Sequence, residues 1–123
     1  MRSLRVLTVL LALVLGGYAA LAAVVPAKDY KLTPVSGHFH LEIKNTTGGP
    51  QNTFYIVFAN EGPVVDKVLA FGPGAPATYT IEKMSGTNFK ITFGTALPAN
   101  AFLMVAIKGT SVTVQGVYGF NIK

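Results

Sequence analysis

The sequence contains no cysteine and no tryptophan, and only 12% of its 123 residues are charged. Without cysteine the chain forms no disulfide and offers no thiolate as a nucleophile or a metal ligand. The low charge argues against a disordered chain, because disordered segments combine low hydrophobicity with high net charge. Half of the residues are apolar. We therefore expect one domain whose stability comes from the packing of a hydrophobic core.

Arginine is also scarce. The two arginines, Arg2 and Arg5, stand at the very start, and the eight lysines are scattered from Lys28 to Lys123. A nucleic-acid-binding chain needs basic side chains gathered on one face, with arginine for bidentate contacts to phosphates and bases. We predict no nucleic-acid partner.

Acidic residues are few as well, with five Asp and Glu in total. They form no pair at a spacing that would suggest a glycosidase, and no serine stands in a G-x-S-x-G setting. Phosphate-binding glycine loops and EF-hand patterns are absent from the sequence. We predict a protein that is not an enzyme, with no catalytic residues and no organic cofactor.

The start of the chain is the longest apolar run. Two arginines precede a set of apolar and then small residues: Val6–Leu15, Gly16–Gly17 and Ala20–Ala22. This order is typical of a secretory signal peptide cleaved before Ala23. The sequence thus predicts a hydrophobic signal helix in residues 1–22 and a secreted or extracytoplasmic protein, at the cell surface or in the periplasm. The alternative is an uncleaved anchor, because residues 6–25 are long enough to span a bilayer; we predict no other membrane contact.

From Gly37 onward, short β-prone runs alternate with turns rich in glycine and proline. This pattern predicts an all-β domain over 37–123, an antiparallel seven-strand β-sandwich of immunoglobulin-like type, with a small β-barrel as the alternative. Residues 23–36 carry two prolines and are expected to be an extended lead-in. The seven expected strands are 38–45, 53–59, 66–72, 78–84, 88–94, 101–109 and 112–122.

Two of these runs, 53–59 and 101–107, are apolar on both faces. A two-layer sandwich buries only one face of each strand, and large exposed apolar patches usually mark interaction sites. Either residues 23–36 fold back across the sheet, or another subunit or cell-surface component covers it. In the second case the lead-in could also add a strand to a neighbour's sheet. The predicted interaction surface consists of Tyr55, Val57, Phe102 and Met104.

The only two histidines, His38 and His40, lie one residue apart, with Glu42 two residues further on. Alternate residues of a strand share one face, so these three side chains could together bind Zn²⁺ or Cu²⁺. The alternative is the hydrated face of a strand whose other face, with Leu41 and Ile43, enters the core. A lack of further nitrogen or sulfur ligands elsewhere favours this second interpretation.

Asn45-Thr46-Thr47 matches the acceptor pattern for N-glycosylation, and it is equally typical of a turn. Tyrosines at Tyr30, Tyr55, Tyr79 and Tyr118 raise a further alternative, a stacking platform for a glycan.

The sequence as a whole favours a secreted or cell-surface β-sandwich without catalysis. We expect it to serve as a structural, adhesive or self-assembling, filament-like module that binds itself or another cell-surface component. The alternatives are an extracytoplasmic copper- or zinc-binding protein that uses His38 and His40, and a carbohydrate-binding module.

Overall fold

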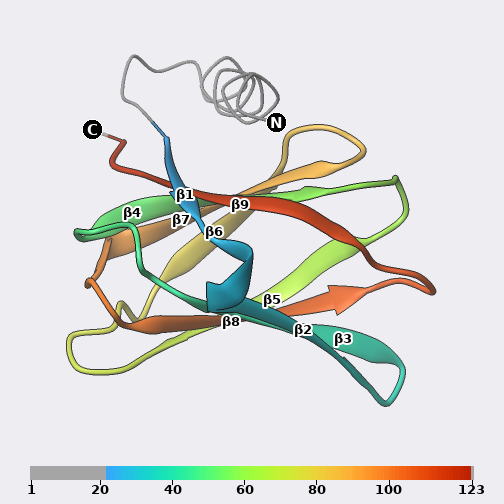
Figure 1. Cartoon of the computed structure of the whole chain (residues 1–123), viewed down its shortest axis with the longest axis horizontal. Coiled ribbons are helices and arrows are strands. Elements are labelled where there is room, and N and C mark those ends of the chain that lie inside the picture. The colour runs from blue at the N-terminus through green and yellow to red at the C-terminus, as the bar shows by residue number, and fades with distance from the viewer. Residues whose placement is uncertain (1–21, 123) are drawn as a thin grey trace.

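The computed structural model describes residues 22–122, which form two antiparallel β-sheets stacked face to face (Figure 1). Residues 1–21 of the predicted signal helix lie outside these residues. Within the described residues no helix is long and apolar enough to span a membrane. The elements are β1 (Ala23–Val25), the 3₁₀ turn η1 (Ala27–Asp29), β2 (Tyr30–Val35), β3 (His38–Lys44), β4 (Gln51–Phe58), β5 (Val64–Phe71), β6 (Tyr79–Lys83), β7 (Asn88–Leu97), β8 (Phe102–Lys108) and β9 (Val114–Phe120).

The all-β sandwich is confirmed, but the described chain has nine strands where we expected seven. β3 to β9 match the predicted runs to within a few residues, and the two extra strands come from residues 23–36. This segment neither crosses the face of a sheet nor remains an unpaired lead-in. β1 pairs with β9, and β2 pairs with β3 at the edge of the other sheet. Pro34 is tolerated in β2 because the backbone N–H groups on the outer side of an edge strand pair with no other strand.

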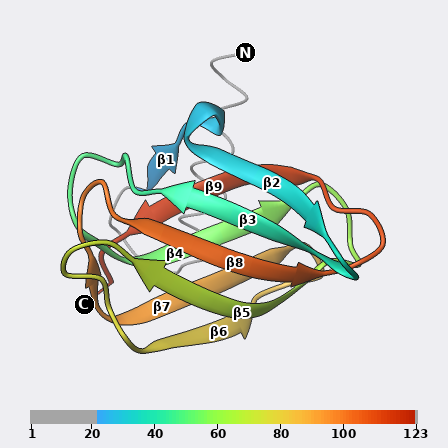
Figure 2. The same ribbon diagram turned by 90° about the horizontal axis from the view of Figure 1, so that it is seen from below.

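The strand order corrects the immunoglobulin-like prediction. One sheet, sheet A, has the order β1-β9-β4-β7-β6, and the other, sheet B, has the order β2-β3-β8-β5 (Figure 2). In the immunoglobulin order the first of seven strands lies beside the second and the last lies beside the sixth. Here β3, the first of the predicted seven, pairs with β8, while the last, β9, pairs with β4. The pairs are nested, β1 with β9, β3 with β8 and β4 with β7, as in a jelly roll.

The main hydrophobic core fills the space between the sheets. Alternate residues of β3, β4, β7 and β8 point into it, as the period of two requires. Phenylalanines of β4 and β7 meet edge to face, with ring centroids 6.2 Å apart for Phe54–Phe93 and 5.8 Å apart for Phe58–Phe89. Two separate sheets that share this core establish a sandwich and not the alternative barrel.

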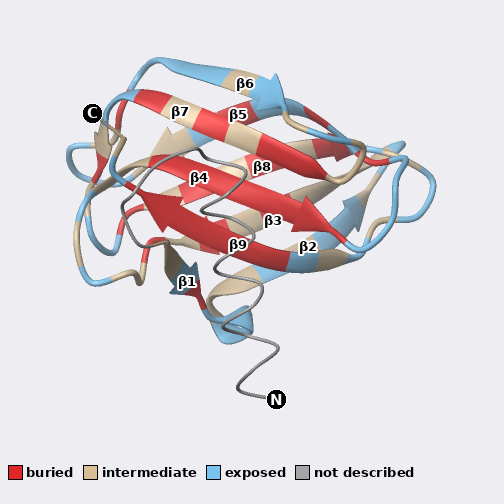
Figure 3. Ribbon diagram, turned by 90° about the horizontal axis from the view of Figure 1, so that it is seen from above, coloured by how far each residue is buried: buried red, intermediate tan, exposed pale blue. Residues whose placement is uncertain are grey.

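A second cluster lies on the outer face of sheet A, where Figure 3 shows β4 and β9 buried along most of their length. It consists of Tyr55 and Val57 of β4 and Tyr118 and Phe120 of β9. Tyr55 is only 1% exposed, and its ring meets that of Phe120 at 4.9 Å between centroids. The prediction that β4 is apolar on both faces is confirmed, but Tyr55 and Val57 are buried and are not part of an open surface.

Asn45 is a buried polar residue that joins two loops. Its side chain is 0% exposed, and Nδ2 donates to the carbonyl oxygens of Gly49, Leu97 and Pro98 at 3.0–3.1 Å. Its Oδ1 accepts from the Thr47 backbone N–H and hydroxyl. The turn interpretation of this segment is thus correct. The structure contradicts the glycosylation prediction, because Nδ2, the atom that would carry the glycan, is enclosed and fully engaged.

We predict that Asn45→Ala lowers the free energy of unfolding by about 2–4 kcal/mol, because it removes a buried amide that donates to carbonyl oxygens of two loops and accepts from Thr47. Chemical denaturation monitored by tyrosine fluorescence measures the loss. The matched control is Asn60→Ala at an exposed position, which should change stability by less than about 0.5 kcal/mol. Equal losses in the two variants would contradict the structural role of Asn45.

Candidate functional site

The outer face of sheet B carries the most exposed large apolar side chain of the described residues, Leu69, at 63% exposure. Leu69 pairs across the sheet with Met104, and Phe71 pairs with Phe102. Cross-strand partners share one face of a sheet, so the four side chains form a continuous patch. The Phe71 and Phe102 rings are stacked, with centroids 5.3 Å apart and planes 9° from parallel. We call Leu69, Phe71, Phe102 and Met104 the apolar strip.

The strip contains two of the four predicted interaction residues, Phe102 and Met104, and both are partly exposed. Sequence reasoning missed Leu69 and Phe71. A β-bulge between Val65 and Lys67 shifts the pairing of β5, so Val65 and Val68 both face the core although they are three residues apart. The signal that could have found them is the alternation in 68–71. If Val68 faces the core, Leu69 and Phe71 must point to the opposite face of the strand.

Charged side chains of both signs surround the strip. Lys31 lies opposite Glu42 in the β2–β3 pairing, and Lys44 lies opposite Phe102 in the β3–β8 pairing. On the β5 side, Lys108 Nζ lies 3.6 Å from Asp66 Oδ1. A lysine therefore lies next to a carboxylate on each side of the apolar strip. We call these charged residues, Lys31, Glu42, Lys44, Asp66 and Lys108, the rim.

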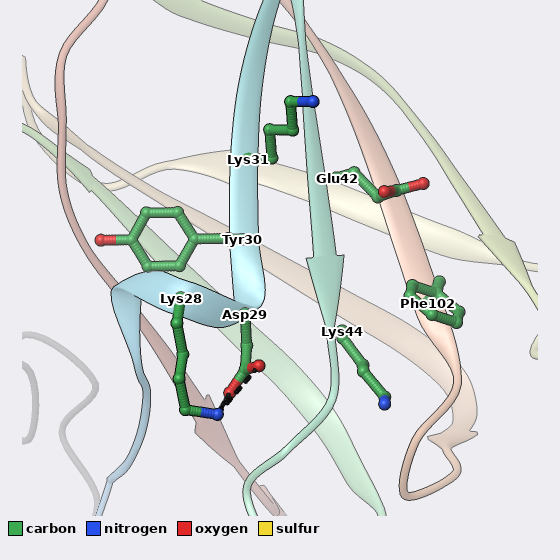
Figure 4. Close-up of a pocket in the computed structure, with 7 residues that line it drawn as sticks. All are labelled: Lys28, Asp29, Tyr30, Lys31, Glu42, Lys44 and Phe102. Carbon is green, nitrogen blue, oxygen red and sulfur yellow. Dashed lines mark hydrogen bonds and ion pairs between the residues drawn. The ribbon is translucent and has the colours of Figure 1, made fainter.

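A hollow of about 260 Å³ opens beside the strip, at the end where β2 begins (Figure 4). It is lined by three lysines, two carboxylates and two aromatic residues: Lys28, Lys31, Lys44, Asp29, Glu42, Tyr30 and Phe102. Asp29 receives hydrogen bonds from the Thr46 hydroxyl at 2.8 Å and from Lys28 Nζ at 3.1 Å. The three lysines exceed the two carboxylates by a single charge, and Lys28 is already paired with Asp29, so the hollow has only a small surplus of positive charge for an anion.

The two histidines are brought together on the same face. Their Nε2 atoms lie 3.2 Å apart, and His38 Nδ1 lies 3.0 Å from the backbone carbonyl oxygen of Ser36. A carbonyl oxygen only accepts, so Nδ1 of His38 carries the proton. In neutral His38 the Nε2 atom then has a free lone pair, which accepts the N–H of His40. The local cause is the turn before β3, where Gly37 adopts a φ of 81° and lets the chain reverse.

Glu42 lies on the same face of β3, but the described residues contain no group of three or more His, Cys, Asp or Glu side chains that could hold a metal ion. The structure thus brings two of the three predicted ligands together, the two histidines. Glu42 lies between its cross-strand partners Lys31 and Met104.

The four tyrosines considered for glycan stacking are dispersed. Tyr55 and Tyr118 belong to the cluster on sheet A, Tyr30 packs against the main core, and Tyr79 lies on the edge strand β6. Partial burial raises the pKa of the Tyr30 hydroxyl above its usual value. These positions do not form a common platform.

Comparison of the chain with protein-family models, with curated proteins and with solved structures finds no match.

We predict that Asp29 contributes to acid sensitivity. The Thr46 hydroxyl, followed by the Lys28 ammonium, lowers the pKa of Asp29 below its usual 3.8. A lowered folded-state pKa gives stability that is present above the unfolded pKa and is lost as the pH falls through the folded pKa. The Asp29→Asn variant should therefore lose less stability than the unmodified protein between about pH 5 and about pH 2, in urea denaturation at each pH.

The control for this series is Asp66→Asn, which removes a carboxylate from the exposed rim of sheet B and leaves the Asp29–Thr46 contact intact. Its acid dependence should stay steeper than that of Asp29→Asn. Identical acid dependence of Asp29→Asn and the unmodified chain would show that the Asp29 contacts add nothing to stability.

Proposed function

We propose that this protein is an exported, non-catalytic β-sandwich that assembles with further copies of itself through the outer face of sheet B. The observation that carries the proposal is the apolar strip, in which Leu69 and its neighbours lie on the open side of a sheet. The proposed export is supported by the signal-like order of residues 1–22.

A second copy fits this face better than an unrelated partner does, for two reasons. Two β-sheets stack face to face at about 10 Å when apolar side chains interdigitate, and the strip offers such side chains on a sheet. The rim also carries both signs of charge, Lys31 beside Glu42 and Lys108 beside Asp66. A two-fold axis can therefore place a lysine of one copy against a carboxylate of the other.

The expected strength follows from the size of the strip. Fully burying a leucine or phenylalanine side chain stabilises a complex by about 1.5–3 kcal/mol, and the strip residues other than Leu69 are already partly buried. Association itself costs about 4–15 kcal/mol in lost freedom. Strip contacts alone should thus give a weak complex, suited to an assembly that gains strength from many copies.

The placement of the polar groups supports a non-catalytic role. Within residues 22–122 the histidine rings hydrogen-bond to each other and to the Ser36 carbonyl oxygen, and neither ring hydrogen-bonds to a serine hydroxyl. A nucleophile needs a base within hydrogen-bond reach. The carbohydrate-binding alternative has less support, because Phe71 and Phe102 cover one face of each other's rings.

We predict that the purified protein associates reversibly as its concentration rises from about 10 µM to about 1 mM. The double variant Leu69→Lys with Met104→Lys should raise the concentration of half association at least about 10-fold. Like charges placed on the symmetric contact repel and remove apolar area at once. Sedimentation equilibrium in the presence of a metal chelator measures the shift.

The matched control is Val24→Lys, because Val24 is an exposed apolar residue of β1 in sheet A. It should leave the association unchanged. A protein that stays monomeric at every concentration, or a Val24→Lys effect equal to that of the strip variant, would overturn the assignment of sheet B.

A further inference from the structure

The separation of the two histidine Nε2 atoms suits a tetrahedral zinc site. The two Nε2 atoms lie 3.2 Å apart. With Zn–N distances of about 2.0–2.1 Å, an ion equidistant from both atoms would subtend an N–Zn–N angle of about 100–106°, close to the tetrahedral value of about 109°. The square-planar geometry preferred by Cu²⁺ requires an angle of about 90° and hence a shorter separation. The observed separation therefore suits Zn²⁺ better than Cu²⁺.

The Ser36 carbonyl supplies an independent indication. A metal-binding histidine usually donates its other ring N–H to a carbonyl or carboxylate, which fixes the tautomer and the ring orientation. His38 does this already, through Nδ1 to the Ser36 oxygen at 3.0 Å. This contact fixes the tautomer that leaves Nε2 free to bind an ion, and the ring then only has to turn its Nε2 lone pair from the His40 nitrogen toward an ion placed beside both.

The pair also has open space around it. His40 pairs with Thr33 on β2 and with Ala106 on β8, so both of its direct cross-strand partners on the outer face of sheet B are small. Both histidines are partly exposed. The two ligands that a tetrahedral ion still needs can therefore approach from outside the chain.

We propose that one Zn²⁺ bridges two copies of this chain, each of which contributes His38 Nε2 and His40 Nε2 about a two-fold axis. The described residues hold no third ligand near the pair, and a symmetric second copy supplies the missing two. The inference rests on the proposed function, because both place a second copy on the outer face of sheet B, and it makes zinc the regulator of that contact.

The proton balance is simple. In the metal-free pair, His40 donates its Nε2 proton to His38. When Zn²⁺ binds, that proton leaves Nε2 and the ring takes one at Nδ1, so His40 remains neutral and both Nε2 lone pairs coordinate the ion. Four Zn–N bonds form, and the ion releases the water molecules that the four nitrogens replace.

The test is sedimentation equilibrium and calorimetric titration of the purified protein with ZnCl₂. We expect about one Zn²⁺ per two chains, a dimer whose dissociation constant falls at least about 100-fold on zinc addition, and full reversal by EDTA. His38→Ala and His40→Ala should each abolish the zinc response. Glu42→Gln, on the same face but outside the pair, should retain it, and MgCl₂ should have no effect.

Thermal unfolding in EDTA checks that the histidine variants are folded, and X-ray absorption at the zinc edge reports the ligands directly. Four nitrogen ligands at about 2.0 Å support the bridge. One Zn²⁺ per chain without dimer formation, or an unchanged zinc response in His40→Ala, would overturn it.

The two proposals fail separately. Association that depends on the strip in EDTA and ignores zinc supports the proposed function and overturns the bridge. A zinc dimer without any concentration-dependent association in EDTA supports the bridge and overturns the strip as the driving contact.

Discussion

Strand β4 (Gln51–Phe58) is paired on both edges and buried on both faces, and the remaining architecture is arranged around it. β7 and β9 satisfy its backbone on either side, while Phe54, Ile56 and Phe58 enter the main core. Tyr55 and Val57 enter the second cluster on the opposite face. A strand with no solvent-exposed face is typical of the middle of a sheet. The neighbours of β4 in sheet A are β7 and β9, and both pairings belong to the sheet order β1-β9-β4-β7-β6.

Much of the local structure could be predicted from the sequence. The seven central strands follow from alternating apolar residues and from turns rich in glycine and proline, which are local signals. β1 and β2 were missed because Pro26 and Pro34 suppress the strand pattern, although Pro26 lies just after β1 and the edge strand β2 tolerates Pro34. The order of the strands was not predictable in this way. An amphipathic strand has the same alternation whichever neighbour it pairs with, so the sequence is silent on whether β3 lies beside β4 or beside β8.

The surface features also divide into those that local sequence patterns predict and those that depend on the tertiary structure. Phe102 and Met104 were predictable because β8 alternates regularly, whereas the bulge in β5 disrupts the phase that would have revealed Leu69 and Phe71. His38 and His40 share a face because of the strand period, but their 3.2 Å separation depends on ring orientations that the Ser36 carbonyl helps to fix. The burial of Asn45 depends on loops about fifty residues apart in the sequence, which no local pattern reports.

The pairing of β1 with β9 has a consequence for the order of events during folding. Ala23 is the first residue of β1 and lies opposite Gly119, near the other end of the chain. Contacts between residues far apart in the sequence cost more loop-closure entropy than local contacts do, and they tend to form late in folding. The β6–β7 pair, whose strands follow one another in the sequence, can therefore form before β1 docks on β9. We thus expect the β1 edge of sheet A to close after the centre of the sheet has assembled.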